Sequence, residues 1–411
     1  MPDVSRGQIG ILACPGGRLF AEAVFGHLEA IAREKFEGRI ASISQAYHLP
    51  REEAIRQVNL AADLLPSSME SDEPIDRYRS PNWMVPAVFT RFPNGELKTT
   101  LLASVRNTDV YVIQDVSNRY PLEFQRSQEP AVLSVNDHVF SLIVTVDAAL
   151  QAGAQRVTVV LPTYPYSRQH KKLGRESLSA ARIGQMLENL GVSRLVTLDI
   201  HSKEIENSFN HLRVENLHGA YQILKVLATV VDLKSEDLAI VSPDVGAVER
   251  NKFYASILGR PLAMLYKERD YSRVAMSADR GNITDMHLLG SVAGKTVLMC
   301  DDLLGTGGTL IKAMRVLKAL GAARTVCAVS LPLFSAGAAE SFDAAWREGL
   351  FHRIIGTSAV YLGREILERE WYLSADVSNL FARIIWRLHH NRSLGSLLDD
   401  RSPIKDLLKR S

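Results

Sequence analysis

The sequence predicts an α/β fold of two domains, each built on a parallel β-sheet flanked by helices. A chain of 411 residues, 46% of them hydrophobic, suits two domains better than one. Short apolar or β-branched runs recur, and each one ends at Gly, Pro, Asp or Ser and precedes a helix-like segment. Strands that alternate with helices are typical of parallel sheets covered on both faces. The runs are QIGILA, DVYVIQ, RVTVVLP, RLVTLDI, LAIVSP, KTVLMC, TVCAVSLP and RIIGTSA.

These elements indicate where the domains divide. We expect the first domain to cover residues 1–219 and the second to cover residues 220–411, with the active site between them. The last helix, LFARIIWRLHH, is expected to pack back onto the first domain.

Residues 32–87 differ from the rest of the chain and predict an insertion near the N-terminus. They are charged and end in the Pro- and Ser-bearing stretch PSSMESDEPIDRYRSPNW. One helix is expected there, starting at Pro50. It places Ile55, Val58 and Ala62 on one stripe, which is more typical of local packing than of a docking face.

The composition argues against several classes of protein. The chain has 48 basic and 46 acidic residues, a formal charge of +2, so no global positive charge points to nucleic acid or to an anionic membrane. Its three cysteines, Cys14, Cys300 and Cys327, are too few and scattered for a disulfide framework or a zinc site. The N-terminus lacks the long apolar stretch of a signal peptide. We therefore expect a cytoplasmic protein that binds neither nucleic acid nor a membrane.

The strongest motif is DDLLGTGGT, residues 301–309, between the strand KTVLMC and the helix LIKAMRVLKALG. Gly307 and Gly308 allow backbone N–H groups to approach a phosphate, and the helix N-terminus adds a favourable dipole. Thr306 and Thr309 supply hydroxyl donors. Asp301 and Asp302 end the strand and can accept hydrogen bonds from sugar hydroxyls, directly or through a hydrated metal ion. The motif therefore predicts a site for a phosphorylated sugar.

This nonapeptide resembles the phosphoribosyl-binding loop of the type I phosphoribosyltransferases and of the ribose-phosphate diphosphokinases. Further segments, from about residue 91 to residue 398, resemble the diphosphokinases in chain order. The resemblance implies two phosphoribosyltransferase-like domains and an enzyme of nucleotide biosynthesis. Such an enzyme transfers the diphosphoryl group of ATP to the C1 hydroxyl of ribose 5-phosphate and releases AMP. Ribose 5-phosphate would be bound by Asp301, Asp302, Thr306, Gly307, Gly308 and Thr309.

Two segments resemble the parts of the family that contact ATP. In Arg91-Phe92-Pro93-Asn94-Gly95-Glu96, the ring of Phe92 would stack on adenine, and Asn94 and Glu96 would reach the edge of the base. Arg168 and Gln169 follow the strand RVTVVLP, and the guanidinium fork of Arg168 suits phosphate oxygens.

Other segments match the family's metal ligands and catalytic cations. His201 and Asp244 follow strands and would bind Mg²⁺, although an imidazole ligand is unusual for this ion. Lys267 and Arg269 precede the polar stretch DYSRVAMSADRGNITDM, where the family has a mobile catalytic loop. Two cations on a closing loop would stabilise the charge of diphosphoryl transfer.

The resemblance also implies a homo-oligomer whose active sites are shared between subunits. Ser393 and Ser396 resemble the family's closing Ser-x-Ser segment, which binds a regulatory phosphate or ADP between subunits together with an Arg that matches Arg106. One departure concerns the sugar loop, where Gly305 stands in place of the family's third Asp.

Two alternatives remain open. A type I phosphoribosyltransferase of nucleotide salvage would share the sugar loop, but it has no reason to carry Phe92 to Glu96 or Lys267 and Arg269. A non-catalytic regulatory relative would bind nucleotide without turnover. Retention of Lys267, Arg269, His201 and Asp244 argues against the second alternative.

Overall fold

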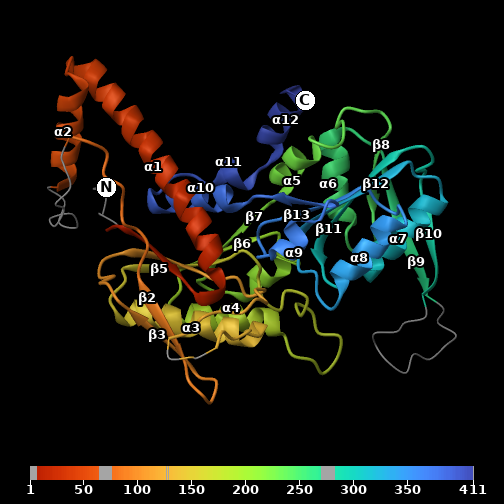
Figure 1. The fold of residues 1–411 in the computed structure, drawn as a ribbon, viewed down its shortest axis with the longest axis horizontal. Helices are drawn as coiled ribbons and strands as arrows, with labels where there is room; N and C mark the ends of the chain where they lie inside the picture. The colour runs from red at the N-terminus through yellow and green to blue at the C-terminus, as the bar shows by residue number, and fades with distance from the viewer. Residues whose placement is uncertain (1–6, 64–75, 126, 128, 270–282, 411) are drawn as a thin grey trace. The chain divides into compact units, whose positions relative to one another are not determined.

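The computed structural model describes residues 7–63, 76–125, 127, 129–269 and 283–410, which form two compact units (Figure 1). The first unit contains Met1–Thr197, Ser202–Glu215 and Ser378–Leu397. The second contains Leu198–His201, Asn216–Val377 and Leu398–Ser411.

The first unit is built on a five-stranded sheet in the order β1-β4-β5-β6-β7. Neighbouring strands from β1 to β6 pair in parallel. All residues of β4 are buried, as expected for a β-branched strand covered on both faces. A separate antiparallel hairpin, β2 and β3, adds two strands that the sequence analysis did not foresee. The strands are β1 (Ile9–Ala13), β2 (Ala87–Arg91), β3 (Leu97–Leu101), β4 (Asp109–Ile113), β5 (Arg156–Leu161), β6 (Arg194–Leu198) and β7 (Arg213–Leu217).

The helices of the first unit begin and end at recognisable signals. Ser134 caps the first turn of α3 in a capping box with Asp137, and Gly191 ends α4 in the left-handed region at φ 100°. α10 packs against α1, where the rings of Phe20 and Phe381 meet edge to face at 5.1 Å. The helical segments are η1 (Pro15–Gly17), α1 (Arg18–Tyr47), α2 (Arg51–Asp63), α3 (Val135–Gln151), α4 (Ser179–Leu190), η2 (Lys203–Ser208) and α10 (Ser378–His389).

The insertion is largely helical where the structure describes it. α1 continues through residues 32–47, and α2 folds back against its end (Figure 1). Ile40, Ala54 and Ile55 form a small core with Val58 beside it, so the predicted stripe does pack locally; the side chain of Ala62 lies outside the described residues. The continuation of α1 was not foreseen, because after Leu28 only Ile40 is buried and the apolar period is weak.

The second unit is built on a seven-stranded sheet in the order β10-β9-β8-β11-β12-β13-β14. β10 pairs antiparallel with β9, and the other neighbours are parallel. The strands are β8 (Leu238–Ser242), β9 (Leu262–Arg269), β10 (Ile283–Leu289), β11 (Thr296–Leu304), β12 (Arg324–Pro332), β13 (Arg353–Thr357) and β14 (Tyr372–Ala375).

Helices cover both faces of this sheet. Val297 and Met299 belong to a core with α7 and α8, while Leu298 and Cys300 belong to a second core with α5 and α6. Strand residues that alternate between two cores explain why KTVLMC is apolar throughout. The helices of this unit are α5 (Ala220–Leu227), α6 (Val248–Leu258), α7 (Gly308–Ala319), α8 (Ala338–Arg347), α9 (Arg364–Leu367) and α12 (Arg401–Arg410). The short helix α11 (Gly395–Leu398) lies almost entirely in the first unit.

All eight predicted strands are present, but one is longer than expected. β11 does not end at Cys300; it continues through Asp301 to Leu304, because Asp301, Leu303 and Leu304 pair with β12. The glycine-rich turn is therefore confined to residues 305–307. No helix in the described part of the chain has the length and apolar character needed to cross a membrane.

Candidate functional site

The turn after β11 presents backbone groups to solvent. Gly307 adopts φ 76° and precedes the first turn of α7, which has no side-chain cap. A Cβ at Gly307 would overlap the ring of Phe342. Both this contact and the positive φ therefore require glycine at this position. Thr306, Gly308 and Thr309 are exposed. The uncapped N–H groups of α7 are therefore accessible to an anion.

Asp301 and Asp302, in the carboxyl-terminal half of β11, interact strongly. The N–H of Asp302 donates to Asp301 Oδ1 at 2.9 Å. Burial, followed by the charge of Asp302, raises the pKa of Asp301 well above its usual range. Burial opposes ionisation of Asp302, but hydrogen bonding to His201 and the charges of His201 and Arg250 outweigh it and lower its pKa.

His201 lies directly beside this acid pair, with its Nδ1 2.5 Å from Asp302 Oδ2. Asp244 follows β8, where its Oδ1 accepts the N–H of Ala247 at 3.0 Å. Its charge also contributes to the raised pKa of Asp301. Because β8 and β11 are neighbouring parallel strands, the structure brings His201, Asp244 and the acid pair to one edge of the sheet. Among the described residues, no three His, Cys, Asp or Glu side chains are grouped so as to hold a metal ion by themselves.

A buried network of hydrogen bonds and ion pairs, centred on Asp199, lies next to His201. Asp199 has φ 42°, and its carboxylate accepts hydrogen bonds from the N–H of Gly219 at 3.1 Å and the hydroxyl of Ser330 at 2.6 Å. His218 Nδ1 lies 2.9 Å and Arg250 Nη1 3.5 Å from Asp199 Oδ1. Burial would raise the pKa of Asp199, but Arg250, His218 and Ser330 together lower it far below its usual range. Arg250 thus balances Asp199 and also acts on Asp302.

We expect Asp199→Asn to lower the free energy of unfolding by about 3 kcal/mol at pH 7, because it leaves Arg250 buried without its charge partner. The lowered pKa means that the ionised carboxylate stabilises the fold above the ordinary aspartate pKa of about 3.9, and that this contribution declines as the pH falls below it. Urea denaturation should therefore show a large difference from the parent at pH 7 that narrows at pH 3. Asp237→Asn, which changes an exposed acid of the same unit, is the control. An equal loss in both variants would contradict the charge argument.

The candidate adenine residues lie in the first unit, at the tip of the β2–β3 hairpin. The turn is closed by a hydrogen bond from the N–H of Phe92 to the carbonyl of Glu96 at 2.8 Å, and Asn94 Oδ1 accepts the N–H of Glu96 at 3.2 Å. Phe92 is 37% exposed, an unusual position for a phenylalanine without a binding partner. The side chains of Phe92, Asn94 and Glu96 all face solvent.

Arg168 and Gln169 lie in the loop that follows β5 and are both exposed. The loop is turned by Tyr166, which has φ 57° and whose carbonyl accepts the N–H of Gln169 at 2.8 Å. These are local bonds that leave both side chains available at the carboxyl end of the sheet, where ligands of α/β folds bind.

Lys267 and Arg269 lie in β9, but their side chains and residues 270–282 are outside the described residues. The pairing of β9 with β8 nevertheless shows where the backbone of Lys267 lies along the sheet. Ser242, the last residue of β8, pairs with Met264, so Lys267 lies just past the end of β8, as Asp244 does.

The three residues that resemble a regulatory phosphate site, Arg106, Ser393 and Ser396, all belong to the first unit. Ser396 Oγ accepts a hydrogen bond from Arg387 at 2.7 Å, and Ser393 is exposed nearby. Arg106 is exposed in the turn before β4. Within the described part of the first unit, no hydrogen bond or ion pair joins Arg106 to either serine.

Comparison with known proteins identifies the family. A model of the N-terminal domain of ribose phosphate pyrophosphokinase matches residues 80–191, and a phosphoribosyl transferase domain model matches residues 213–357. A ribose-phosphate pyrophosphokinase of Parasynechococcus marenigrum is 31% identical over 314 residues, which are 76% of this chain and 86% of that protein. The chain belongs to the ribose-phosphate pyrophosphokinase family.

Other members of the family agree with this assignment. The ribose-phosphate pyrophosphokinase of a Nostoc species is 30% identical over 336 residues, covering 80% of this chain and 91% of that protein. The crystal structure of phosphoribosylpyrophosphate synthetase from Mycobacterium smegmatis superposes with a TM-score of 0.66 at 22% identity, covering 93% of this chain and 99% of that chain. The expected fold of two phosphoribosyltransferase-like domains is therefore confirmed.

Sequence reasoning missed the supporting residues of this pyrophosphokinase-family site. The strand pattern includes Asp199 only as part of the run RLVTLDI, and it does not connect Asp199 with Arg250, His218 or Ser330. Arg250 lies on α6 and Ser330 on β12, and no local spacing joins them to Asp199. Only Asp199, a charged residue at the end of an apolar strand, gave a sequence-level indication.

Proposed function

We propose that this protein transfers the diphosphoryl group of ATP to the C1 hydroxyl of ribose 5-phosphate, giving phosphoribosyl diphosphate and AMP. The observation that carries the proposal is the acid pair Asp301 and Asp302, which precedes an uncapped helix N-terminus in a chain of this family. Incubation of the purified protein with ATP, Mg²⁺ and ribose 5-phosphate tests this proposal. Formation of AMP supports the proposal. A phosphoribosyltransferase would form no AMP, and a non-catalytic relative would show no turnover.

Ribose 5-phosphate would occupy the turn after β11. Its phosphate would accept hydrogen bonds from the N–H groups of Gly307 and Gly308 and from the hydroxyls of Thr306 and Thr309. Its ring hydroxyls would donate to the carboxylates of Asp301 and Asp302. Strand-borne carboxylates are held more precisely than loop residues, which favours exact placement of the attacking hydroxyl.

ATP would be held by residues of the first unit. The exposed ring of Phe92 offers a stacking surface for adenine, Asn94 and Glu96 offer polar contacts to its edge, and Arg168 and Gln169 reach phosphate oxygens. The hairpin tip carries an exposed apolar ring with no partner beyond its own turn among the described residues. This exposure is consistent with a homo-oligomer in which the hairpin completes the site of a neighbouring subunit.

The residues at the edge of the second sheet fit a magnesium ion. Mg²⁺ takes only one or two carboxylates from a protein and completes its shell with water and substrate phosphates, so a complete protein cage is not needed. Burial and the charge of Asp302 raise the pKa of Asp301, and a cation bound nearby would favour its ionised form. His201 and Asp244 would hold the ion, and when bound it would neutralise negative charge on the diphosphate. Asp302 would keep the imidazole of His201 in place through its contact at Nδ1.

We expect Gly305→Asp to tighten the apparent binding of ribose 5-phosphate. The family has an Asp here, and an added acceptor near the sugar would contribute about 1 kcal/mol, or roughly a fivefold lower KM. The backbone accepts the change, because Gly305 is not at positive φ and a Cβ would meet only ordinary contacts, at 3.6 Å from Ser335 and 3.7 Å from Leu303. Steady-state kinetics should show little change in the KM for ATP.

The matched control is Gly308→Asp, since a Cβ at Gly308 has no atom within 4 Å. It adds the same charge next to the predicted phosphate position and should raise the KM for ribose 5-phosphate instead. If Gly305→Asp abolishes activity while the fold remains intact, the turn works as in the phosphoribosyltransferases, and that alternative gains weight.

A further inference from the structure

The hydroxyl of Ser335, in the loop after β12, lies beside the position at which Gly305 replaces the family's third Asp. Gly305 stands between the acid pair of β11 and the residues assigned to the phosphate. A Cβ at Gly305 would lie 3.6 Å from Ser335 Oγ. Among the described residues other than its chain neighbours, the one further atom within 4 Å belongs to Leu303, an apolar side chain. The hydroxyl of Ser335 is therefore the polar group that a side chain at residue 305 would meet.

Backbone hydrogen bonds hold the loop of Ser335 against this turn. The N–H groups of Leu333 and Phe334 donate to the carbonyl of Leu304, at 2.8 Å and 3.1 Å. The N–H of Ser335 donates to the carbonyl of Gly305 at 3.1 Å. β11 and β12 are paired neighbours, and these three bonds extend their contact into the turn. The position of Ser335 next to the turn is thus fixed by the backbone.

The same loop has a backbone conformation that side chains rarely adopt. Phe334 has φ 45° and Ala336 has φ 51°, which is strained for residues other than glycine. The ring of Phe334 is 2% exposed and lies 5.8 Å from the ring of Phe342. Burial of this ring offsets the strain, because it anchors the loop in the core. The strained backbone is what turns the peptide of Ser335 toward Gly305.

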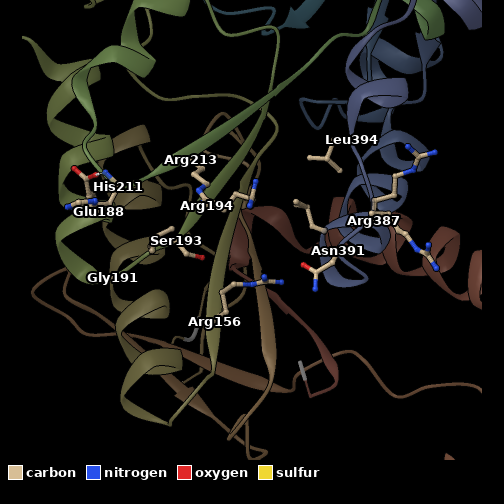
Figure 2. Close-up of a pocket in the computed structure, with 13 residues that line it drawn as sticks. Arg156, Glu188, Gly191, Ser193, Arg194, His211, Arg213, Arg387, Asn391 and Leu394 are labelled. Carbon is tan, nitrogen blue, oxygen red and sulfur yellow. Dashed lines mark hydrogen bonds between the residues drawn. The ribbon is translucent and has the colours of Figure 1, made fainter. Parts of the chain in front are cut away.

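The hydroxyl of Ser335 is not used by the fold. Ser335 is partly exposed, and within the described part of the chain its Oγ forms no hydrogen bond. Other serines differ: Ser330 Oγ donates to Asp199 at 2.6 Å. Ser193, which lines the cavity of the first unit drawn in Figure 2, donates from its Oγ to the carbonyl of Val157 at 3.2 Å. The hydroxyl of Ser335 keeps its full capacity of one donated and two accepted hydrogen bonds for a ligand.

We propose that Ser335 binds the sugar of ribose 5-phosphate and supplies the hydrogen-bond acceptor that Gly305 lacks. This inference rests on the proposed function, in which ribose 5-phosphate occupies the turn after β11. A serine oxygen accepts a hydrogen bond from a ring hydroxyl, as an aspartate would. It carries no charge, so it does not repel the phosphate bound at the neighbouring N–H groups. Ser335 is thus a specificity-determining residue that compensates for the glycine in this chain.

The test is a double-mutant cycle read by direct binding. Ribose 5-phosphate is titrated calorimetrically, without ATP, into the parent, Ser335→Ala, Gly305→Asp and the variant that carries both changes. We expect Ser335→Ala to raise the dissociation constant of the parent by about fivefold, the effect of one lost hydrogen bond. In the Gly305→Asp background the carboxylate takes over the contact, so the same change should have less than a twofold effect. Neighbouring residues that share one function are expected to be non-additive in this way.

Steady-state kinetics provide the second measurement. Ser335→Ala should raise the KM for ribose 5-phosphate by the same factor, while kcat and the KM for ATP stay within about twofold, because the contact is made equally in the ground state and the transition state. The matched control is Ser256→Ala, which removes an exposed hydroxyl from α6 of the same unit and should change neither constant. Circular dichroism checks that each variant is folded.

The outcomes separate this inference from the proposed function. Equal affinity for ribose 5-phosphate in the parent and Ser335→Ala, with AMP still formed, would overturn the role of Ser335 alone. An equal loss in both backgrounds would also overturn it, because it would show a structural effect of the loop. If the parent binds ribose 5-phosphate with the expected dependence on Ser335 but forms no AMP, the proposed reaction fails and the sugar contact stands. A parent that does not bind ribose 5-phosphate would overturn both.

Discussion

Lys267→Ala should lower kcat by about 10³-fold while the affinity for ATP changes little, because a cation supplied to the transferring group acts mainly on the transition state. The strand register supports its place at the site: Lys267 lies just past the end of β8 on the same sheet edge as Asp244. Arg269 follows two residues later in the same strand. Single-turnover kinetics with saturating substrates would measure the chemical step.

Lys252→Ala is the matched control, because it removes an exposed lysine from α6 in the same unit. Its kcat should stay within about twofold of the parent. If Lys267→Ala also stays within about threefold, corresponding to less than 1 kcal/mol, the assignment of Lys267 to the transition state is wrong. A large rise in KM with an unchanged kcat would instead show that Lys267 binds ground-state ATP.

Replacing both His201 and Asp244 by asparagine should abolish magnesium-dependent ATP binding, with a loss of at least about 100-fold. Neither side chain is packed in a core: that of His201 is 33% exposed, and Asp244 is half-buried. The fold should therefore persist. Calorimetry with ATP in the presence and absence of Mg²⁺ separates loss of the metal contribution from loss of the nucleotide site. Unchanged affinity for magnesium-ATP would exclude both residues as ligands.

The control for this pair is Glu249→Gln, an exposed acid at the start of α6. It removes one negative charge near the same strand end and should leave magnesium-ATP affinity within about twofold. A comparable loss in Glu249→Gln would indicate a general electrostatic effect, because long-range charge and direct ligation are otherwise hard to separate.

The eight predicted strands and the glycine-rich turn after β11 could be recognised in the sequence because their local chemistry is unambiguous. β4 and β8 are buried throughout, so their apolar runs have no competing interpretation. β7 was missed, since Arg213, Glu215 and Asn216 give RVENL a polar composition and only Leu217 is fully buried. Its place in the sheet depends on tertiary pairing, which overrides β-propensity.

The candidate site was predictable only in part for a similar reason. Asp301 and Asp302 follow one apolar run and His201 follows another, a position that a strand pattern identifies directly. The contact between His201 and Asp302 joins residues 101 positions apart, and the balance of Asp199 by Arg250 joins two different elements. No spacing rule encodes such contacts, because they depend on which strands become neighbours in the sheet.

Because Phe342 contacts both Gly307 and Trp371, the fluorescence of Trp371 should be sensitive to the conformation of the glycine-rich turn. The ring of Phe342 lies against Gly307 in the glycine-rich turn after β11 and 5.8 Å from the ring of Trp371, which is 1% exposed. Indole emission depends on local packing and polarity, and Trp371 is also fixed by donation from its Nε1 to Asp343 at 2.8 Å. Movement of the turn when a phosphate binds would pass through a single ring to this fluorophore. A chain that retains Trp371 as its sole tryptophan would thus register occupancy of the turn by emission alone, without a coupled enzyme or a label.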